Sequence, residues 1–416
     1  MPWLVSPGEL TPEQIRVVEL PHSENRLVSG FPGSGKTQIL MHRAATLRDR
    51  LQTPPERYRI FLYTNVLRDY VRSGLHYLGL EEESALTIDH WCRLTWQEAF
   101  PGKRLPYIPK VPNSKKRRGP DFERIREEVL GVLRSNPAFQ KRLDFALVDE
   151  GQDLSRTQYQ ILELAAKHVT VFADFLQSMF DGGTTETAMR EELRIRQKNL
   201  TLLGAYRNSQ DIASLAGLFL SNEEKRKEYY QSAKPNAIER EQPVLLLAGS
   251  PNDEMDELAN EIKRRLVLNQ TVGILLPKSN LVFGLSKGLA ERGVIVEKAV
   301  PQWGNATPPD YDNSVPKIAT YHSAKGLTFD VVLMPRLVNN AFGQFTPEER
   351  RKMLYVGTAR ARQWVYYSVY GENLLPEVDH LLKETQGRNL LTVIRKEKQA
   401  FVEVDEPDDD EQVSLF

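Results

Sequence analysis

The stretch RLVSGFPGSGKTQIL, residues 26–40, limits what this chain can fold into more than any other. Apolar residues lead into Gly30, and a glycine-rich turn closes on Lys36 and Thr37 with the spacing G-x4-G-K-T. Apolar residues at helical spacing follow, so the stretch predicts a strand, a turn and a helix. Glycines let successive backbone N–H groups face one anion, and the helix N-terminus adds partial positive charge. The pattern therefore predicts a nucleotide-phosphate site in an α/β fold.

Chemical roles follow from this spacing. Lys36 is predicted to reach the β- and γ-phosphates and Thr37 to hold Mg²⁺. The phosphate cradle is predicted to comprise Gly30, Gly33, Ser34, Gly35, Lys36 and Thr37. A second stretch, LDFALVDEGQDLS at 143–155, indicates a short buried strand ending in Asp149 and Glu150. In an ATPase the first carboxylate holds Mg²⁺ through water and the second activates the attacking water. The two stretches together predict a hydrolase that uses ATP and Mg²⁺.

The motif DEGQD resembles the D-E-x-Q-D motif of superfamily 1 helicases of the UvrD/Rep/PcrA type. Further segments resemble other motifs of that family and follow in its order. In the first half of the chain they are LTPEQIRVVELP (10–21), FLYTNVLRDY (61–70), LTIDHWC (86–92) and VFADFLQSMF (171–180). In the second half they are LLGAYRNSQDI (202–212), KIATYHSAKGLTFDVVLMP (317–335) and RKMLYVGTARAR (351–362). The resemblance covers residues 10–362 and implies two RecA-like domains with ATP in the cleft between them.

The resemblance also implies roles for individual residues. At the nucleotide, Gln14 reads the adenine, Tyr206 stacks on it, and Arg207 and Arg360 face the γ-phosphate, with Arg360 as the arginine finger. Gln177 joins these arginines, Lys36, Asp149 and Glu150 in the catalytic set. The implied nucleic-acid contacts are Thr64, Asn65, Thr87, His90, Thr320 and His322. If both arginines reach one phosphate, ATP hydrolysis can open and close the cleft, which is the basis of a motor.

Some positions depart from the family. Thr328 stands where relatives carry a glutamate that contacts the nucleotide sugar, and Gly151 replaces an alanine. The large helical insertion of UvrD-type relatives has no room here. Instead, residues 213–316 predict only RecA-like elements: strands at 243–249, 271–277 and 294–300, and helices at 253–268 and 279–293. The predicted domains are residues 1–200, with a short basic insertion at about 91–143, and residues 201–398, followed by an acidic tail at 399–416.

The segment PGKRLPYIPKVPNSKKRRGP, residues 101–120, contains seven Lys/Arg, five prolines and no acid. Prolines prevent a continuous helix, so an extended basic flap is predicted. Such a flap would contact phosphates without reading sequence, mainly through Lys115, Lys116, Arg117 and Arg118. A solvated loop or a nuclear import signal remains the alternative. Trp91 and Trp96 could stack on bases, but their apolar surroundings favour core packing.

The tail ends in QVSLF after a run, 403–411, in which seven of nine residues are acidic. Such a run disfavours compact structure. The ending resembles the Q-x-x-L-F peptide with which bacterial proteins dock on the sliding clamp. It implies that Gln412 bonds at the pocket rim while Leu415 and Phe416 enter an apolar cleft. An accidental ending is the alternative.

Composition sets further expectations. One cysteine, Cys92, excludes an intramolecular disulfide, and neither a signal peptide nor a membrane-spanning run is visible, so a cytoplasmic protein is expected. The leading prediction is a DNA-stimulated ATPase that translocates on single-stranded DNA, toward the 5′ end by resemblance, and is recruited to replication or repair sites by the clamp. One alternative is an ATP-gated switch that grips DNA or a protein without directional movement. Another is an ATPase directed at RNA, transcription or phage defence.

Overall fold

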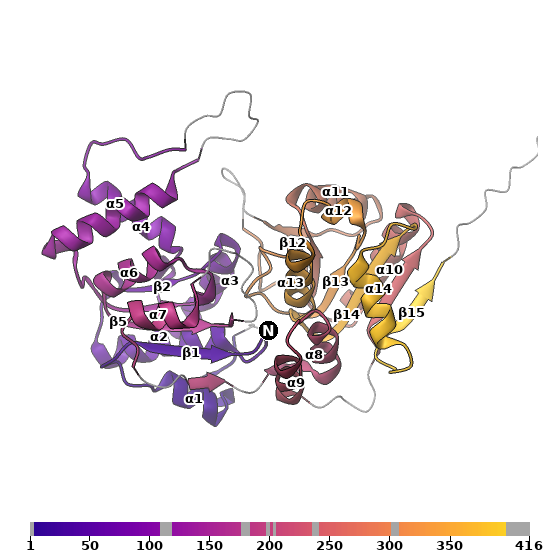
Figure 1. Ribbon diagram of the computed structural model, residues 1–416, viewed down its shortest axis with the longest axis horizontal. Coiled ribbons are helices and arrows are strands. Elements are labelled where there is room, and N and C mark those ends of the chain that lie inside the picture. The colour runs from indigo at the N-terminus through magenta and orange to yellow at the C-terminus, as the bar shows by residue number, and fades with distance from the viewer. Residues whose placement is uncertain are drawn as a thin grey trace, which may run out of the picture.

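The computed structural model describes residues 4–108, 119–175, 184–196, 200–202, 205–234, 241–300 and 308–396. They form two lobes side by side, each built on a sheet of parallel strands covered by helices (Figure 1). The predicted α/β class with two RecA-like parallel sheets is confirmed. Among the described residues, no helix is long and apolar enough to cross a membrane.

The sheet of the first lobe has six strands in the order β3-β2-β4-β5-β1-β6, and all of its pairings are parallel. Their bounds are β1 (Arg26–Gly30), β2 (Tyr58–Phe61), β3 (Ala85–Leu86), β4 (Leu143–Val148), β5 (Ala166–Ala173) and β6 (Leu200–Leu202). The strands are rich in buried apolar residues, as sheets covered on both faces require. Because the strands are parallel, the turns after β1, β2, β4 and β5 meet at one edge.

The helices of the first lobe are α1 (Pro12–Val18), α2 (Lys36–Leu51), α3 (Asn65–Leu75), α4 (Ile88–Ala99), α5 (Phe122–Ser135), α6 (Arg156–Ala165) and α7 (Glu186–Glu192). The predicted strand, turn and helix around the glycine-rich stretch are present as β1 and α2. The end of α4 and all of α5 lie within the predicted insertion, and the two helices pack against each other. Trp96 is 2% exposed in an apolar cluster and Trp91 packs edge-on against Phe61, which supports core packing for both.

The sheet of the second lobe has seven parallel strands in the order β11-β12-β10-β13-β14-β9-β15. Their bounds are β9 (Val244–Ala248), β10 (Val272–Leu276), β11 (Glu297–Ala299), β12 (Lys317–Thr320), β13 (Phe329–Met334), β14 (Ala361–Tyr370) and β15 (Thr392–Arg395). The first two predicted strands lie where expected. The third is shorter than the predicted 294–300, since β11 is an edge strand paired only over three residues with β12.

The helices of the second lobe are α8 (Gln210–Gly217), α9 (Glu223–Ser232), α10 (Pro251–Val267), α11 (Ser279–Glu291), α12 (Asn339–Phe342), α13 (Pro347–Thr358) and α14 (Pro376–Thr385). Helices α10 and α11 match the predicted 253–268 and 279–293 within two residues. Strands β7 (Ala205–Ser209) and β8 (Ala233–Lys234) pair with each other in a small separate sheet. Strand β6 pairs with β1, so the predicted division near residue 200 falls inside the last strand of the first sheet.

The two lobes touch through apolar side chains. Leu67 of α3 packs so closely on Gly326 that a Cβ at Gly326 would lie 2.6 Å from its Cδ1, and the φ of +82° there also favours glycine. Tyr70 of α3 meets Tyr311 edge to face with ring centroids 5.1 Å apart. The segment that carries Gly326 is therefore held against the edge where the turns of the first sheet meet.

Candidate active site

The glycine-rich turn between β1 and α2 forms a backbone cradle. Gly35 has a φ of +88°, and a Cβ at Gly30 would lie 2.7 Å from the Ser34 hydroxyl, so both positions suit glycine. The ammonium of Lys36 lies across this turn and donates to the carbonyls of Gly30 at 2.8 Å and Phe31 at 3.0 Å. It also lies 3.6 Å from a carboxylate oxygen of Asp174, which follows β5. The buried ammonium of Lys36 thus lies against the backbone of the cradle.

Thr37, in the first turn of α2, donates from its hydroxyl to Asp149 Oδ2 at 2.7 Å, although the two residues are 112 positions apart. Asp149 is 1% exposed at the end of β4. Burial and the neighbouring Glu150 raise the pKa of Asp149 to about 6, while the Thr37 hydroxyl and Lys36 act in the other direction. Hydroxyl and carboxylate oxygens are ligands that Mg²⁺ accepts, so this pair fits the predicted metal site beside a nucleotide.

Glu150 is held in an unusual backbone conformation, with φ 53° and ψ 41°, a left-handed region that few non-glycine residues adopt. Its carboxylate accepts a hydrogen bond from Gln152 Nε2 at 2.5 Å. Gln152 in turn accepts the backbone N–H of Asp174 at 2.8 Å, which ties the turn after β4 to the turn after β5. Strained backbone of this kind persists where surrounding contacts fix it, and it is common at catalytic sites.

Charges from the second lobe reach Glu150. Lys325, 1% exposed, lies 3.7 Å from Glu150 Oε2 and forms a hydrogen-bonded ion pair with Asp153. Arg360, just after α13, donates to the carbonyls of Val356 at 3.2 Å and Leu327 at 3.4 Å. Burial alone would raise the pKa of Glu150, but Lys325, Arg360 and Lys36 outweigh burial and hold that pKa below its ordinary value. Glu150 is therefore a buried carboxylate kept ionised by three cations.

The predicted adenine-reading residue lies beside the cradle. Gln14 accepts the N–H of Thr11 at 3.0 Å and donates to the Ser34 carbonyl at 3.2 Å. The helix that carries it, α1, is anchored by Arg43 of α2, a fully buried guanidinium whose NH1 donates to three carbonyls near the end of α1. They are Val17 at 3.3 Å, Val18 at 3.1 Å and Leu20 at 2.9 Å. Helix α1 is thus held at its start by the bond from Gln14 to the glycine-rich turn and at its end by Arg43.

The residues predicted to contact DNA have local structural roles as well. The hydroxyls of Thr64 and Thr87 accept the N–H groups of Leu67 and His90 and so cap α3 and α4. Asn65 is the first residue of α3, and its side-chain oxygen accepts from Arg68 at 3.0 Å.

In the second lobe, the buried hydroxyl of Thr320 bonds to Ser323 at 2.9 Å. Burial and Lys325 lower the pKa of the half-buried His322, while Glu349 opposes them. His90 responds to its surroundings in the same way: burial and nearby arginines lower its pKa. Both imidazoles are therefore neutral at neutral pH and suit contacts with bases or backbone oxygens as well as with phosphates.

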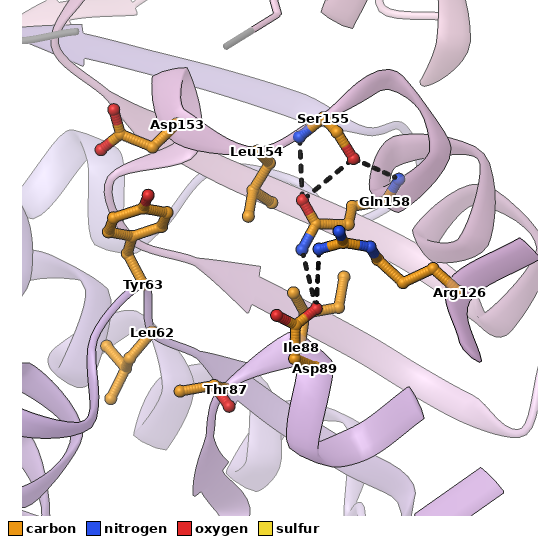
Figure 2. A pocket seen from close by; sticks show the side chains of 10 residues that line it. All are labelled: Leu62, Tyr63, Thr87, Ile88, Asp89, Arg126, Asp153, Leu154, Ser155 and Gln158. Carbon is orange, nitrogen blue, oxygen red and sulfur yellow. Dashed lines mark hydrogen bonds and ion pairs between the residues drawn. The ribbon is translucent and has the colours of Figure 1, made fainter. Parts of the chain in front are cut away.

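A pocket of about 370 Å³ opens beside Thr87 at the same edge of the first sheet. Its ten lining residues come from the turns after β2 and β4 and from α4, α5 and α6: Leu62, Tyr63, Thr87, Ile88, Asp89, Arg126, Asp153, Leu154, Ser155 and Gln158. Figure 2 shows Arg126 and Gln158 converging on Asp89, with Tyr63 facing Asp153 across the opening. The pocket combines one aromatic face with hydrogen-bonding groups, and it shares Asp153 with the Lys325 ion pair.

The structure brings Lys36, Thr37, Asp149, Glu150 and Arg360 together at one place. Gln177, Lys115, Lys116, Arg117, Arg118, Gln412, Leu415 and Phe416 lie outside the described residues, as do the side chains of Tyr206 and Arg207. Only the backbone of the latter two is placed, in β7.

Sequence reasoning gave no role to Lys325, Gln152 or Asp153, although all three stand inside quoted motifs. Their position inside those motifs was the signal that could have marked them as site residues. The departure at Gly151 has a local explanation, because a Cβ there would lie 2.2 Å from Val171 Cγ1. An alanine at this position would require a smaller neighbour on β5.

Comparisons with known proteins agree with this geometry. The model of the UvrD-like helicase C-terminal domain matches residues 306–372, which include Lys325 and Arg360. The ATP-dependent DNA helicase srs2 of Schizosaccharomyces pombe is 28% identical over 187 residues, and the match covers 42% of this chain and 21% of that relative. The chain thus matches only about a fifth of the relative's length.

A solved structure, the C-terminal domain of a possible DNA helicase from Lactobacillus plantarum, is 19% identical, with a TM-score of 0.34 over 45% of this chain and 98% of that one. At that score the likeness decides nothing about this chain. The family model, the curated relative, the ordered motifs and the two parallel sheets all point the same way. The chain is therefore similar to UvrD-like superfamily 1 helicases, most directly over residues 306–372.

Proposed function

We propose that this protein is an ATP-dependent translocase or helicase on single-stranded DNA. One observation carries the proposal: the Glu150 carboxylate lies between the phosphate cradle of one lobe and the cations Lys325 and Arg360 of the other. A nucleotide held there would touch both lobes, so its hydrolysis would change how strongly they attract each other. That coupling is what a motor needs.

The charges of Glu150, Arg360 and Lys36 suggest the role of each in ATP hydrolysis. Glu150 is ionised at neutral pH, so it can orient a water molecule and take its proton as the γ-phosphate is attacked. Arg360 and Lys36 supply the positive charge that phosphoryl transfer requires. Lys36 donates to its own turn in the present structure, and a phosphate would compete for those same three N–H donors. We assign the recognition of adenine to Gln14, in line with the sequence resemblance and its hydrogen bond to the Ser34 carbonyl.

Mg²⁺ would be held by Thr37 and Asp149 together with the nucleotide, and it would neutralise charge on the phosphates. Burial and the neighbouring Glu150 raise the pKa of Asp149, and a bound divalent cation would favour its ionised form. Removing Mg²⁺ with a chelator is therefore expected to abolish turnover.

Single-stranded DNA is proposed to cross the edge of the first sheet beside the pocket of Figure 2. Tyr63 offers a face for base stacking there. Thr64, Thr87 and His90 follow strands that end at this edge, and we assign further DNA contacts to Thr320 and to His322, on which Lys325 acts electrostatically. The 3′-to-5′ direction, the contribution of the basic flap and recruitment by the sliding clamp rest on the sequence resemblance alone.

The decisive experiment measures ATPase rate with single-stranded DNA, duplex DNA, RNA and no nucleic acid. Stimulation by single-stranded DNA is expected. Preferential stimulation by RNA would instead favour the RNA-directed alternative, and ATP-dependent gripping without stepwise movement would favour the switch. Equal rates in all four conditions would contradict the motor proposal.

Glu150→Gln tests the catalytic assignment directly. The variant is expected to bind ATP but hydrolyse it about 100-fold more slowly or worse, the usual worth of a positioned base. Glu348→Gln is the control, because Glu348 is exposed on α13 and its partner is the surface residue Lys352. Near-normal turnover by Glu150→Gln would show that another group activates the water.

A further inference from the structure

Helix α9 buries a single side chain. Its sequence is EEKRKEYYQS, and Tyr229 is its only buried residue, with 0% exposed surface. An amphipathic helix normally buries a stripe of residues. Figure 1 shows α9 on the side of the second lobe nearest the first. A charged helix that inserts one aromatic ring toward the other lobe suggests a specific task for that ring.

The ring of Tyr229 lies between the phosphate cradle and α13. It stacks on Phe31 of the glycine-rich turn, with centroids 5.5 Å apart and planes 24° apart. It also meets Tyr355 of α13 in a T-shaped arrangement, with centroids 6.1 Å apart. The carbonyl of Phe31 accepts from Lys36, and Tyr355 lies in α13, five residues before Arg360. Tyr229 therefore touches both the cradle and the segment that delivers the arginine.

Three buried hydroxyls at this place are left without a hydrogen-bond partner among the described residues: those of Ser34, Tyr229 and Tyr355. Buried hydroxyls are costly to leave unsatisfied, so three of them around one cradle are suited to hydrogen-bond a polar ligand there. Arg360 and Asp174 act electrostatically on both phenols, so both rings lie within electrostatic range of charges that surround the cradle. Burial raises the pKa of Tyr229, so its hydroxyl keeps the proton it would donate.

We propose that the Tyr229 hydroxyl is a further phosphate-binding group, which donates a hydrogen bond to the terminal phosphate of ATP. The inference rests on the proposed ATPase function and adds a residue from a helix outside the quoted motifs. It also gives α9 a role in transmission. Directly after α9, β8 pairs with β7, the strand that contains Tyr206 and Arg207. Loss of the terminal phosphate would release α9 and β7 from the first lobe together.

The test is Tyr229→Phe in the full-length chain, because phenylalanine keeps the stack on Phe31 and removes only the hydroxyl. Calorimetry with Mg²⁺ and a non-hydrolysable ATP analogue is expected to show affinity about tenfold weaker than wild type, the worth of one hydrogen bond to a charged group. Affinity for ADP is expected to stay within about twofold, because ADP lacks the terminal phosphate. Without nucleotide, the variant is expected to melt at or above the wild-type temperature, since no protein partner is lost.

Two matched controls separate this role from packing. Tyr58→Phe removes another buried hydroxyl without a described partner, in a ring stacked on Phe145 at the opposite end of the first sheet. Tyr230→Phe alters the exposed neighbour on α9. Both are expected to bind the two nucleotides as wild type does.

The outcomes are distinguishable. Equal affinity of wild type and Tyr229→Phe for the ATP analogue would overturn this inference and leave the ATPase proposal standing. Equal losses for the analogue and ADP would also overturn it, because they would indicate a disturbed cradle. A wild-type protein that binds neither nucleotide would refute the ATPase proposal itself.

Discussion

Replacing Lys325 by methionine tests whether the two lobes are joined through the catalytic carboxylate. The Lys325 side chain is 1% exposed, and its partners Glu150 and Asp153 are 5% and 0% exposed. Methionine keeps most of the volume and removes the charge, so two carboxylates lose a buried cation. Removing one partner of a buried ion pair typically costs about 3–5 kcal/mol. For lobes of this size, that corresponds to a fall in melting temperature of roughly 6–20 °C.

The same substitution changes the pH dependence of catalysis. Glu150 has a pKa held below its ordinary value by Lys325, then Arg360 and Lys36, against the effect of burial. Its contribution to stability is therefore present above the pKa of the unfolded chain and is lost as pH falls through the lower folded pKa. Without Lys325, less positive charge opposes the effect of burial, so the pKa of Glu150 is expected to rise. Because the base must be ionised, the acid limb of the kcat/KM profile is expected to move to higher pH.

The assay pairs thermal melting with the pH profile of DNA-stimulated ATPase. Lys352→Met is the control, since that lysine pairs with Glu348 in an exposed arrangement on α13. It is expected to leave both the melting temperature and the acid limb unchanged. A Lys325→Met protein with wild-type melting temperature and an unmoved acid limb would refute the reasoning. A lower melting temperature with an unmoved acid limb would show that the ion pair stabilises the fold but does not set the pKa of Glu150.

Two further predictions concern segments outside the described residues. Neutralising the four basic residues of the flap should flatten the slope of log affinity for single-stranded DNA against log salt, because fewer counterions are released; an unchanged slope would place the flap away from the DNA. The residues are Lys115, Lys116, Arg117 and Arg118. Leu415→Ala with Phe416→Ala should abolish binding to the sliding clamp of the source organism, around micromolar at best for so short a peptide, while DNA-stimulated ATPase stays intact. Equal clamp affinity of wild type and double variant would contradict the docking role.

The sequence by itself determined the local parts of this protein. The G-x4-G-K-T spacing predicted β1, the cradle and α2, because glycine placement and apolar periodicity are properties of adjacent residues. The same holds for Asp149 and Glu150 at the end of β4, and for the strands and helices of residues 243–293, whose types were right and whose ends differed by one or two residues. A local rule was also available for Thr64 and Thr87: both cap helices, as threonine before a helical run commonly does.

Only the tertiary structure decided which distant groups meet. Lys325 and Asp153 are 172 residues apart, and nothing in either motif says that the ammonium of one lobe closes on the carboxylates of the other. Tyr229 stands in a stretch that reads as an exposed charged helix, yet its ring is buried against Phe31. Sequence patterns encode how neighbouring residues share a helix or strand, whereas these contacts depend on how two sheets and their helices pack against each other. The charge that keeps Glu150 ionised is therefore a product of lobe packing, and no local pattern could have revealed it.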